Sequence, residues 1–149
     1  MPAEFRKVGI AFQYPENWTL DEDDALAGRK SVTVYSPGGA FWTVSVYPHS
    51  TDPQKLAREA VKVMKQEYQE LEVEPASEVI AGRETVGFDL GFYYLDLTNT
   101  ASVRCFRTDR ATYAFFCQAE DREFAQIQRV FLAMGTSFLG NLKHPRDRG

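Results

Sequence analysis

The chain contains 149 residues, of which 44% are hydrophobic and 13% are aromatic, and its formal net charge is -4. This length is typical of one domain with a sizeable core, and the hydrophobic content excludes an intrinsically disordered chain. Because the 21 acidic and 17 basic residues are spread along the sequence, no basic patch indicates a nucleic acid or an anionic membrane as a partner.

The sequence also gives an expectation about the cellular compartment of the protein. Residues 1–7 show no apolar signal segment, and no stretch reaches the ~18 apolar residues that a membrane span requires. We therefore expect a cytoplasmic protein. The two cysteines, Cys105 and Cys117, form no metal-binding or redox motif. A disulfide between them is the alternative, but buried free thiols suit a reducing compartment better.

Short strands with intervening turns are predicted for the first third of the chain, at residues 5–8, 10–14, 18–20, 30–36 and 40–47. The sequence Ser36-Pro37-Gly38-Gly39 predicts a hairpin turn between the last two, because proline presets one turn dihedral and glycine tolerates positive φ.

A helix is predicted to start at Asp52 and Pro53, since Asp can accept a hydrogen bond from an unpaired helix amide and Pro lacks the N–H that would go unused there. The apolar residues that follow have helical spacing: Leu56, Ala60, Met64, Tyr68 and Leu71. We expect this helix to run to about residue 74 and to cover one face of a sheet.

A meander of strands is predicted next, at residues 78–81, 85–97, 102–107 and 112–118, with turns at Gly82-Arg83, Asn99-Thr100 and Thr108-Asp109-Arg110. Residues 88–97 and 113–117 are apolar at both odd and even positions, so we expect both faces of the sheet centre to be covered.

The second cover is predicted to be a helix beginning at Asp121, with Phe124, Ile127, Phe131 and Met134 on its buried side. Gly135 is expected to end this helix, residues 137–139 to be extended, and residues 140–149 to form a flexible polar tail. The predicted fold is α+β, an antiparallel sheet between helices in three layers.

A family resemblance is based on two segments, VGIAFQYPENW at residues 8–18 and VFLAMGTSF at residues 130–138, with the helix after Asp52-Pro53 and the meander between them. This order resembles the PsbP-like superfamily, which includes photosystem extrinsic subunits, a Ran-GTPase release factor and bacterial proteins of unknown role. The resemblance implies an antiparallel sheet between helices, here in a single domain of residues 1–149. It also implies action by binding other macromolecules.

The sequence contains few residues in the spacings that are typical of catalytic or metal sites. His49 and His144 are the two histidines, and they give no metal-ligand spacing, so we expect no metal, no cofactor and no catalytic residue. Asp89 and Asp96 lie an odd number of positions apart, which places them on opposite faces of an ideal strand. Each is expected to pair with a neighbour such as Arg104 rather than to act as an acid and base couple.

Candidate binding residues fall in two groups. Phe41, Trp42 and Tyr47 follow the Pro-Gly-Gly turn, and together in solvent they would form a patch that marks a partner site. Asp96 and Arg104 would supply converging polar groups if a cleft formed around them.

Three functions remain open from the sequence. The leading hypothesis is a non-enzymatic binding or scaffold domain that docks an unknown protein partner. The alternative is a small-ligand-binding protein with an aromatic-lined cleft between sheet and helix. The third is an enzyme that uses Asp89, Asp96, Arg104 or Cys105 in a concave site. The oligomeric state is left open.

Overall fold

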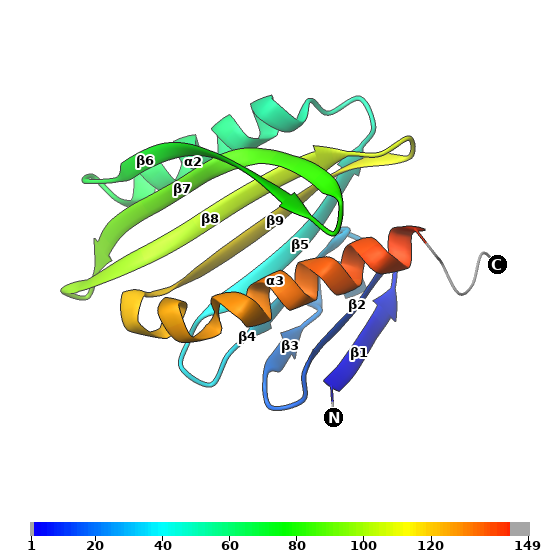
Figure 1. Ribbon diagram of the computed structural model, residues 1–149, viewed down its shortest axis with the longest axis horizontal. Coiled ribbons are helices and arrows are strands. Elements are labelled where there is room, and N and C mark those ends of the chain that lie inside the picture. The colour runs from blue at the N-terminus through cyan, green and yellow to red at the C-terminus, as the bar shows by residue number, and fades with distance from the viewer. Residues whose placement is uncertain (1, 144–149) are drawn as a thin grey trace.

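The computed structural model describes residues 2–143. Seven strands form one antiparallel sheet in the order β3-β4-β5-β9-β8-β7-β6, and β1 pairs with β2 in a separate hairpin (Figure 1). The strands are β1 (Pro2–Lys7), β2 (Ile10–Pro15), β3 (Thr19–Asp21), β4 (Ser31–Tyr35), β5 (Phe41–Pro48), β6 (Glu72–Ile80), β7 (Arg83–Tyr94), β8 (Leu97–Arg107) and β9 (Ala111–Glu120). The helices are α1 (Asp23–Leu26), α2 (Pro53–Glu67) and α3 (Asp121–Lys143).

The two long helices lie on opposite faces of the sheet. α2 packs on β7, β8 and β9, and α3 lies across the other face beside the β1-β2 hairpin (Figure 1). Each face of the central strands is therefore covered by a helix, as the apolar character of both faces predicts. The three-layer α+β architecture predicted from the sequence is confirmed.

The core on the α3 side is aromatic. The Trp42 ring lies 5.0 Å from the Phe12 ring and 5.4 Å from the Phe115 ring, measured between centroids. Phe115 in turn contacts Phe138 of α3 at 5.6 Å. The rings meet tilted or edge to face, the arrangements that aromatic quadrupoles favour. This core joins β2, β5, β9 and α3.

α2 begins where the sequence predicts. The Asp52 carboxylate accepts a hydrogen bond from the Gln54 backbone N–H at 3.0 Å, and Pro53 occupies the first turn. The predicted end at about residue 74 is wrong, because the helix stops at Glu67 and Tyr68 is extended. Tyr68 still packs on Phe92 with ring centroids 4.2 Å apart, so its helix-like spacing reflects packing beyond the helix end.

β6 is correspondingly longer than predicted. It pairs with β7 from Glu72 to Ile80 and forms one edge of the sheet. Pro75 fits within it because an edge strand can lack an N–H on its outer side.

The turn between β7 and β8 is at Leu95 and Asp96, not at the predicted Asn99 and Thr100, which are paired within β8. Both turn residues have positive φ, 53° and 62°. This is the conformation of a two-residue hairpin turn that normally takes Asn-Gly or Asp-Gly. Leu95-Asp96 does not have this composition. The sequence pattern therefore favours a turn at the more polar Asn99-Thr100 pair instead.

α3 does not end at Gly135, and residues 137–139 are helical rather than extended. A Cβ at Gly135 would lie 3.2 Å from the Phe115 ring, so this glycine lets the helix approach the sheet closely. Phe138 and Leu139 are buried as part of the same stripe. Residues 140–143 of the predicted tail also belong to α3, and residues 144–149 lie outside the described residues.

Candidate functional site

The three aromatic residues predicted to form an exposed patch do not share a face. Trp42 is buried at 2% exposure on the α3 side, whereas Phe41 and Tyr47 lie on the α2 side of the same strand. The predicted patch is therefore corrected, because alternate residues of a strand point in opposite directions. Phe41 is half-buried between the rings of Tyr35 and Phe116 at 5.8 and 5.9 Å, and Tyr47 is exposed near the end of β5.

The two polar candidates are also separated. Asp96 is exposed at the β7–β8 turn, whereas Arg104 pairs with Gly87 deep in the sheet. A cleft that includes both residues does not form, since the seven residue steps along β8 from Leu97 to Arg104 span roughly 23 Å. Arg104 does meet Asp89, which is one of the pairings predicted from the sequence.

Arg104 is the centre of an ionic cluster on the α3 side of the sheet. Its Nε donates to Glu78 Oε1 at 3.0 Å and its Nη2 to Asp89 Oδ1 at 2.7 Å. Its Nη1 donates to the carbonyl oxygens of Phe88 and Val103, both at 3.1 Å. The side chain is only 11% exposed, so these partners compensate for the loss of water around the guanidinium.

A cleft of about 400 Å³ lies between this cluster and α3. The sheet contributes a polar wall of Glu78, Asp89, Thr100, Ser102 and Arg104. The apolar lining includes Phe115 and Cys117 of β9 and Phe124, Phe131 and Leu132 of α3. This volume is within the range of small-molecule sites.

The thiols offer little nucleophilic chemistry. Burial raises the pKa of the Cys105 thiol to about 12. Burial also raises the pKa of the Cys117 thiol to about 12, with Asp89 and Glu78 adding to the rise and Arg104 and Ser102 opposing it. Both cysteines are free, and they lie on opposite sides of the sheet, Cys105 in the α2-side core and Cys117 in the α3-side cleft. A neutral thiol is a poor nucleophile.

Metal ligands do not gather in the described structure. No group of three or more His, Cys, Asp or Glu side chains within residues 2–143 is placed to hold a metal ion. Of the residues considered for an enzyme, Asp89 and Arg104 converge, but Cys105 faces the other side of the sheet and Asp96 is in the turn.

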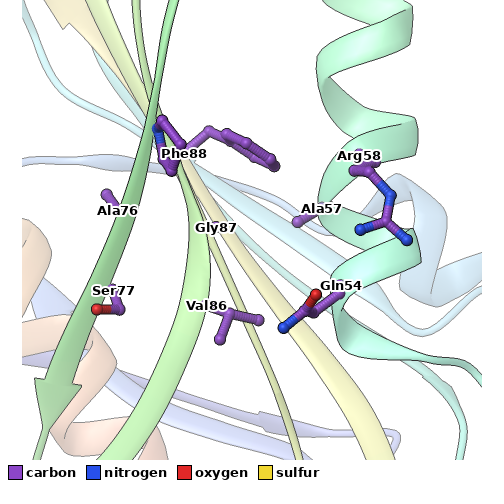
Figure 2. Close-up of a pocket in the computed structure, with 9 residues that line it drawn as sticks. Gln54, Ala57, Arg58, Ala76, Ser77, Val86, Gly87 and Phe88 are labelled. Carbon is purple, nitrogen blue, oxygen red and sulfur yellow. The ribbon is translucent and has the colours of Figure 1, made fainter.

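A second pocket, of about 310 Å³, lies between the first turns of α2 and the strands β6 and β7 (Figure 2). Gln54 and Arg58 line it from the helix, and Ala76, Val86 and Phe88 line it from the strands (Figure 2). Both polar helix residues are exposed, and no acidic side chain lines this pocket. It therefore offers fewer polar contacts than the α3-side cleft.

Several exposed apolar or aromatic side chains lie at the end of the β7–β8 hairpin, which we call the hairpin tip: Tyr93, Tyr94, Leu95, Asp96 and Leu97. It projects at the left of Figure 1. Leu95 is 77% exposed, and Tyr93, Tyr94 and Leu97 are 64%, 51% and 44% exposed. Tyr94 and its partner Leu97 lie on the α2 side of the hairpin, Tyr93 lies on the α3 side, and Leu95 lies in the turn between the strands. The tip thus exposes apolar or aromatic side chains on both faces and at its end, and exposed apolar surface of this kind marks interaction sites.

The backbone of the hairpin tip is unusual as well. Leu95 has a φ of 53°, in the left-handed region that costs a residue with a Cβ about 1–2 kcal/mol. The sequence does not predict this site, because Tyr93, Tyr94 and Leu95 continue the pattern of a strand that is buried on both faces. The apolar run at residues 88–97 is longer than the part of the strand that α2 can cover. Its length is the sequence feature that indicates exposed apolar residues at the end of the strand.

Tyr68 connects the hairpin tip to the core. Its ring packs on Phe92 and meets Tyr94 edge to face at 6.4 Å. Burial raises the pKa of the Tyr68 hydroxyl, the charge of Glu67 adds to the rise, and a hydrogen bond with Gln118 lowers it. Tyr94 is thus supported from beneath by a neutral aromatic side chain.

The segments around the hairpin tip are acidic. The tip itself carries Asp96, and Glu72 and Glu120 pair with Gly91 and Asn99, close to the ends of the two tip strands. Further charged residues lie at the end of α2, in the connection from α2 to β6 and at the start of α3: Lys65, Glu67, Glu70, Asp121 and Arg122. Arg122 is itself 3.6 Å from Glu120, which leaves an excess of negative charge around the apolar residues.

Comparison with known proteins identifies the fold. No protein-family model and no curated protein matches the sequence. Among solved structures, cyanobacterial PsbP (CyanoP) from Synechocystis sp. PCC 6803 matches with a TM-score of 0.60 and 12% identity, over 91% of this chain and 90% of that one. The Saccharomyces cerevisiae Ran-binding protein Mog1p matches with a TM-score of 0.52 and 11% identity, over 94% and 91% of the two chains.

The chain has the PsbP/Mog1-like fold. A Pseudomonas aeruginosa protein of unknown function, the putative regulator PA94, has it too, with a TM-score of 0.51 and 10% identity over 99% of this chain and 98% of that one. At these identities the PsbP/Mog1-like likeness establishes architecture and not activity. Within the described residues, no helix has the length and apolar character needed to cross a membrane.

Proposed function

We propose that this protein is a non-enzymatic binding module that docks a protein partner through the hairpin tip. The observation that supports the proposal is Leu95, which is both 77% exposed and held at a φ of 53°. The positive φ destabilises the folded protein, since Asn-Gly would relieve the strain, and the exposed side chain gains no burial on folding. An interaction that buries Leu95 would give this exposed side chain a role.

The neighbours of Leu95 suit this role. Tyr93 and Tyr94 are large side chains with few rotatable bonds, and tyrosine is enriched among residues that dominate binding energy. The Tyr94 ring is already oriented by Tyr68, so less conformational entropy is lost on binding. Mog1p, which shares the fold, is a Ran-binding protein, and this gives a precedent for protein binding on the same architecture.

The charges around the tip indicate the chemistry of the partner. Asp96, Glu72 and Glu120 surround the apolar residues, so a partner surface with basic residues around an apolar centre would be complementary. Exposed charges are screened by salt, and association with such a partner is expected to slow as the ionic strength rises.

Site-specific photo-crosslinking tests the docking proposal. A benzophenone amino acid placed at position 94 of the full chain, in the cells that normally produce it, is expected to trap a discrete basic protein. The same group at position 47 is the matched control, because Tyr47 is 37% exposed and lies near the far end of the sheet. Equal products from both positions, or none from position 94, would contradict docking at the tip.

The trapped partner then allows an affinity measurement. Leu95→Ser is expected to weaken binding at least ~10-fold, as removal of a central apolar contact does. Val79→Ser is the control, since Val79 is an equally apolar residue, 62% exposed, at the opposite end of β6 from the tip. A similar loss for both variants would argue against a specific role for Leu95.

A second candidate function is small-ligand binding, and the cleft of about 400 Å³ beside Arg104 favours it. The cleft combines an aromatic and aliphatic lining with a few polar side chains, which is the usual composition of a ligand pocket. It is formed by α3 and the sheet and is separate from the hairpin tip, so the two candidate functions can be tested independently.

A further inference from the structure

The α3-side cleft has two chemically different walls. Phe124, Phe131 and Leu132 of α3 form part of the apolar lining, and Leu132 is 46% exposed at the surface. Across from them, Glu78 and Asp89 are held side by side through Arg104, to which each gives one carboxylate oxygen. A ligand in the cleft would therefore meet the carboxylates on the sheet side, and on the α3 side an apolar surface with Gln128 and Arg129 beside it.

On the sheet wall of the cleft, most of the hydrogen-bonding capacity that remains around Arg104 is that of an acceptor. Arg104 uses four of its five N–H groups in the hydrogen bonds to Glu78, Phe88, Val103 and Asp89. The second oxygens of Glu78 and Asp89 have no hydrogen-bond partner among residues 2–143, and these side chains are 41% and 50% exposed. A ligand that donates hydrogen bonds is thus favoured over one that accepts them.

The charged side chains that line the cleft are divided between its two walls. Glu78, Asp89 and Arg104 on the sheet sum to a formal charge of -1 and Arg129 on α3 adds +1, so the lining is neutral overall and the negative excess is confined to the sheet wall. Asp121 lies at the cleft end, where its carboxylate accepts a hydrogen bond from the Thr100 hydroxyl at 2.7 Å. The remaining cation of the lining, Arg129, is exposed on α3 and also borders the surface toward β2. An anion would have to compete with two carboxylates already bound to Arg104.

We propose that this cleft binds a small organic cation, an ammonium or amidinium group attached to an aromatic or branched apolar body. The cationic group lies at the free oxygens of Glu78 and Asp89, and the apolar body packs against Phe124, Phe131 and Leu132. This inference rests on the second candidate function, ligand binding, and is independent of docking at the hairpin tip.

Three probes of similar shape test the charge preference: 2-phenylethylammonium, 2-phenylethanol and 3-phenylpropionate. Amide chemical shifts of the full chain are followed by NMR during titration with each. The ammonium is expected to shift Ser102 and Gly135 saturably, and not Val86 in the pocket of Figure 2. The alcohol is expected to bind at least ~10-fold more weakly, and the carboxylate more weakly still, because a hydrogen bond between charged groups is lost.

Isosteric variants test the residues. Asp89→Asn and Glu78→Gln are each expected to weaken 2-phenylethylammonium binding ~10-fold while leaving 2-phenylethanol binding unchanged. Asp96→Asn, which removes the same charge at the hairpin tip, is expected to change neither. The amide spectrum of each variant without ligand shows whether the fold is retained, and the unchanged affinity for the neutral probe is a second control.

The possible outcomes distinguish a preference for cations from ligand binding in general. If 2-phenylethanol or 3-phenylpropionate binds the cleft as tightly as the ammonium, the cation preference is overturned and ligand binding stands. If no probe shifts the cleft residues, both the cation site and the ligand-binding function are overturned. Neither result affects the crosslinking test at position 94.

Discussion

Two glycines of β7 show how differently the same residue can be used. Gly87 pairs with Arg104 and Gly91 with Thr100, on the side of the sheet that faces α3. A Cβ at Gly87 would overlap the carbonyl oxygen of Val103, whereas at Gly91 the nearest atom, Glu72 Oε2, would be 3.6 Å away. Gly87 therefore allows β8 to approach β7 closely enough for Arg104 to reach the Phe88 carbonyl.

Replacement of these glycines by alanine is expected to have unequal effects. Gly87→Ala should lower the free energy of unfolding by about 2 kcal/mol or more, because the backbone of β8 must move. Gly91→Ala should change it by less than about 0.5 kcal/mol. Urea unfolding of both variants is the measurement, and equal destabilisation would show that close approach at Gly87 is unimportant.

Residue chemistry explains which site features could be predicted. The pairing of Asp89 with Arg104 followed from the need of a charge in an apolar strand for a partner. Glu78 was not anticipated in the cluster, because β6 was predicted to begin there and not at Glu72. Leu95 was missed because leucine has no local preference for positive φ, so its conformation is imposed by the pairing of β7 with β8.

At the level of elements, starts were easier to predict than ends. Asp52-Pro53 and Asp121 mark helix starts through local hydrogen bonding or charge, which depends only on adjacent residues. The ends of α2 and α3 depend on tertiary packing: Tyr68 leaves the helix yet remains buried on Phe92, and Gly135 continues the helix because it fits against Phe115. Such choices are not encoded within a short window of sequence.

The β7–β8 hairpin provides a test that separates stability from function. The double substitution Leu95→Asn with Asp96→Gly places the preferred residues of a type I′ turn at the tip. It is expected to raise the free energy of unfolding by about 1 kcal/mol, because Gly adopts positive φ without strain and Asn tolerates it.

The same double variant is expected to lose crosslinking from position 94. Thermal unfolding and crosslinking yield are measured on one preparation, with the unsubstituted chain as control. A variant that is more stable and still crosslinks normally would indicate that the strained leucine has no part in docking.

At the scale of the whole molecule, two separate cores share one sheet. Cys105 lies in the core beneath α2 and Cys117 in the cleft beneath α3. Both thiols have a pKa of about 12 in the folded protein, well above the value of ~8.5 for an exposed thiol in an unfolded chain. The folded state therefore favours the protonated form of both thiols, one on each side of the sheet.

Stability is expected to fall in alkaline solution. Because the folded pKa exceeds the unfolded pKa, the contribution of each thiol is complete below ~8.5 and is lost as the pH rises toward the folded value. The urea midpoint should therefore decrease between about pH 8 and about pH 10.5. Cys105→Ala with Cys117→Ala should flatten this dependence whatever its effect at neutral pH, and an unchanged slope would exclude the thiols as its cause. The raised pKa of Tyr68 adds a smaller slope in the same direction.

The first and last described segments of the chain are held together. The Gln13 backbone N–H donates to the Ser137 hydroxyl at 2.8 Å, and the Asn141 amide donates to the Ala11 carbonyl at 3.2 Å. During synthesis, the β1-β2 hairpin is translated well before α3, so its buried residues Phe12 and Ile10 lack the part of their native cover that α3 supplies. Chaperone contact with the nascent chain is therefore expected to concentrate on this apolar hairpin until α3 has been translated.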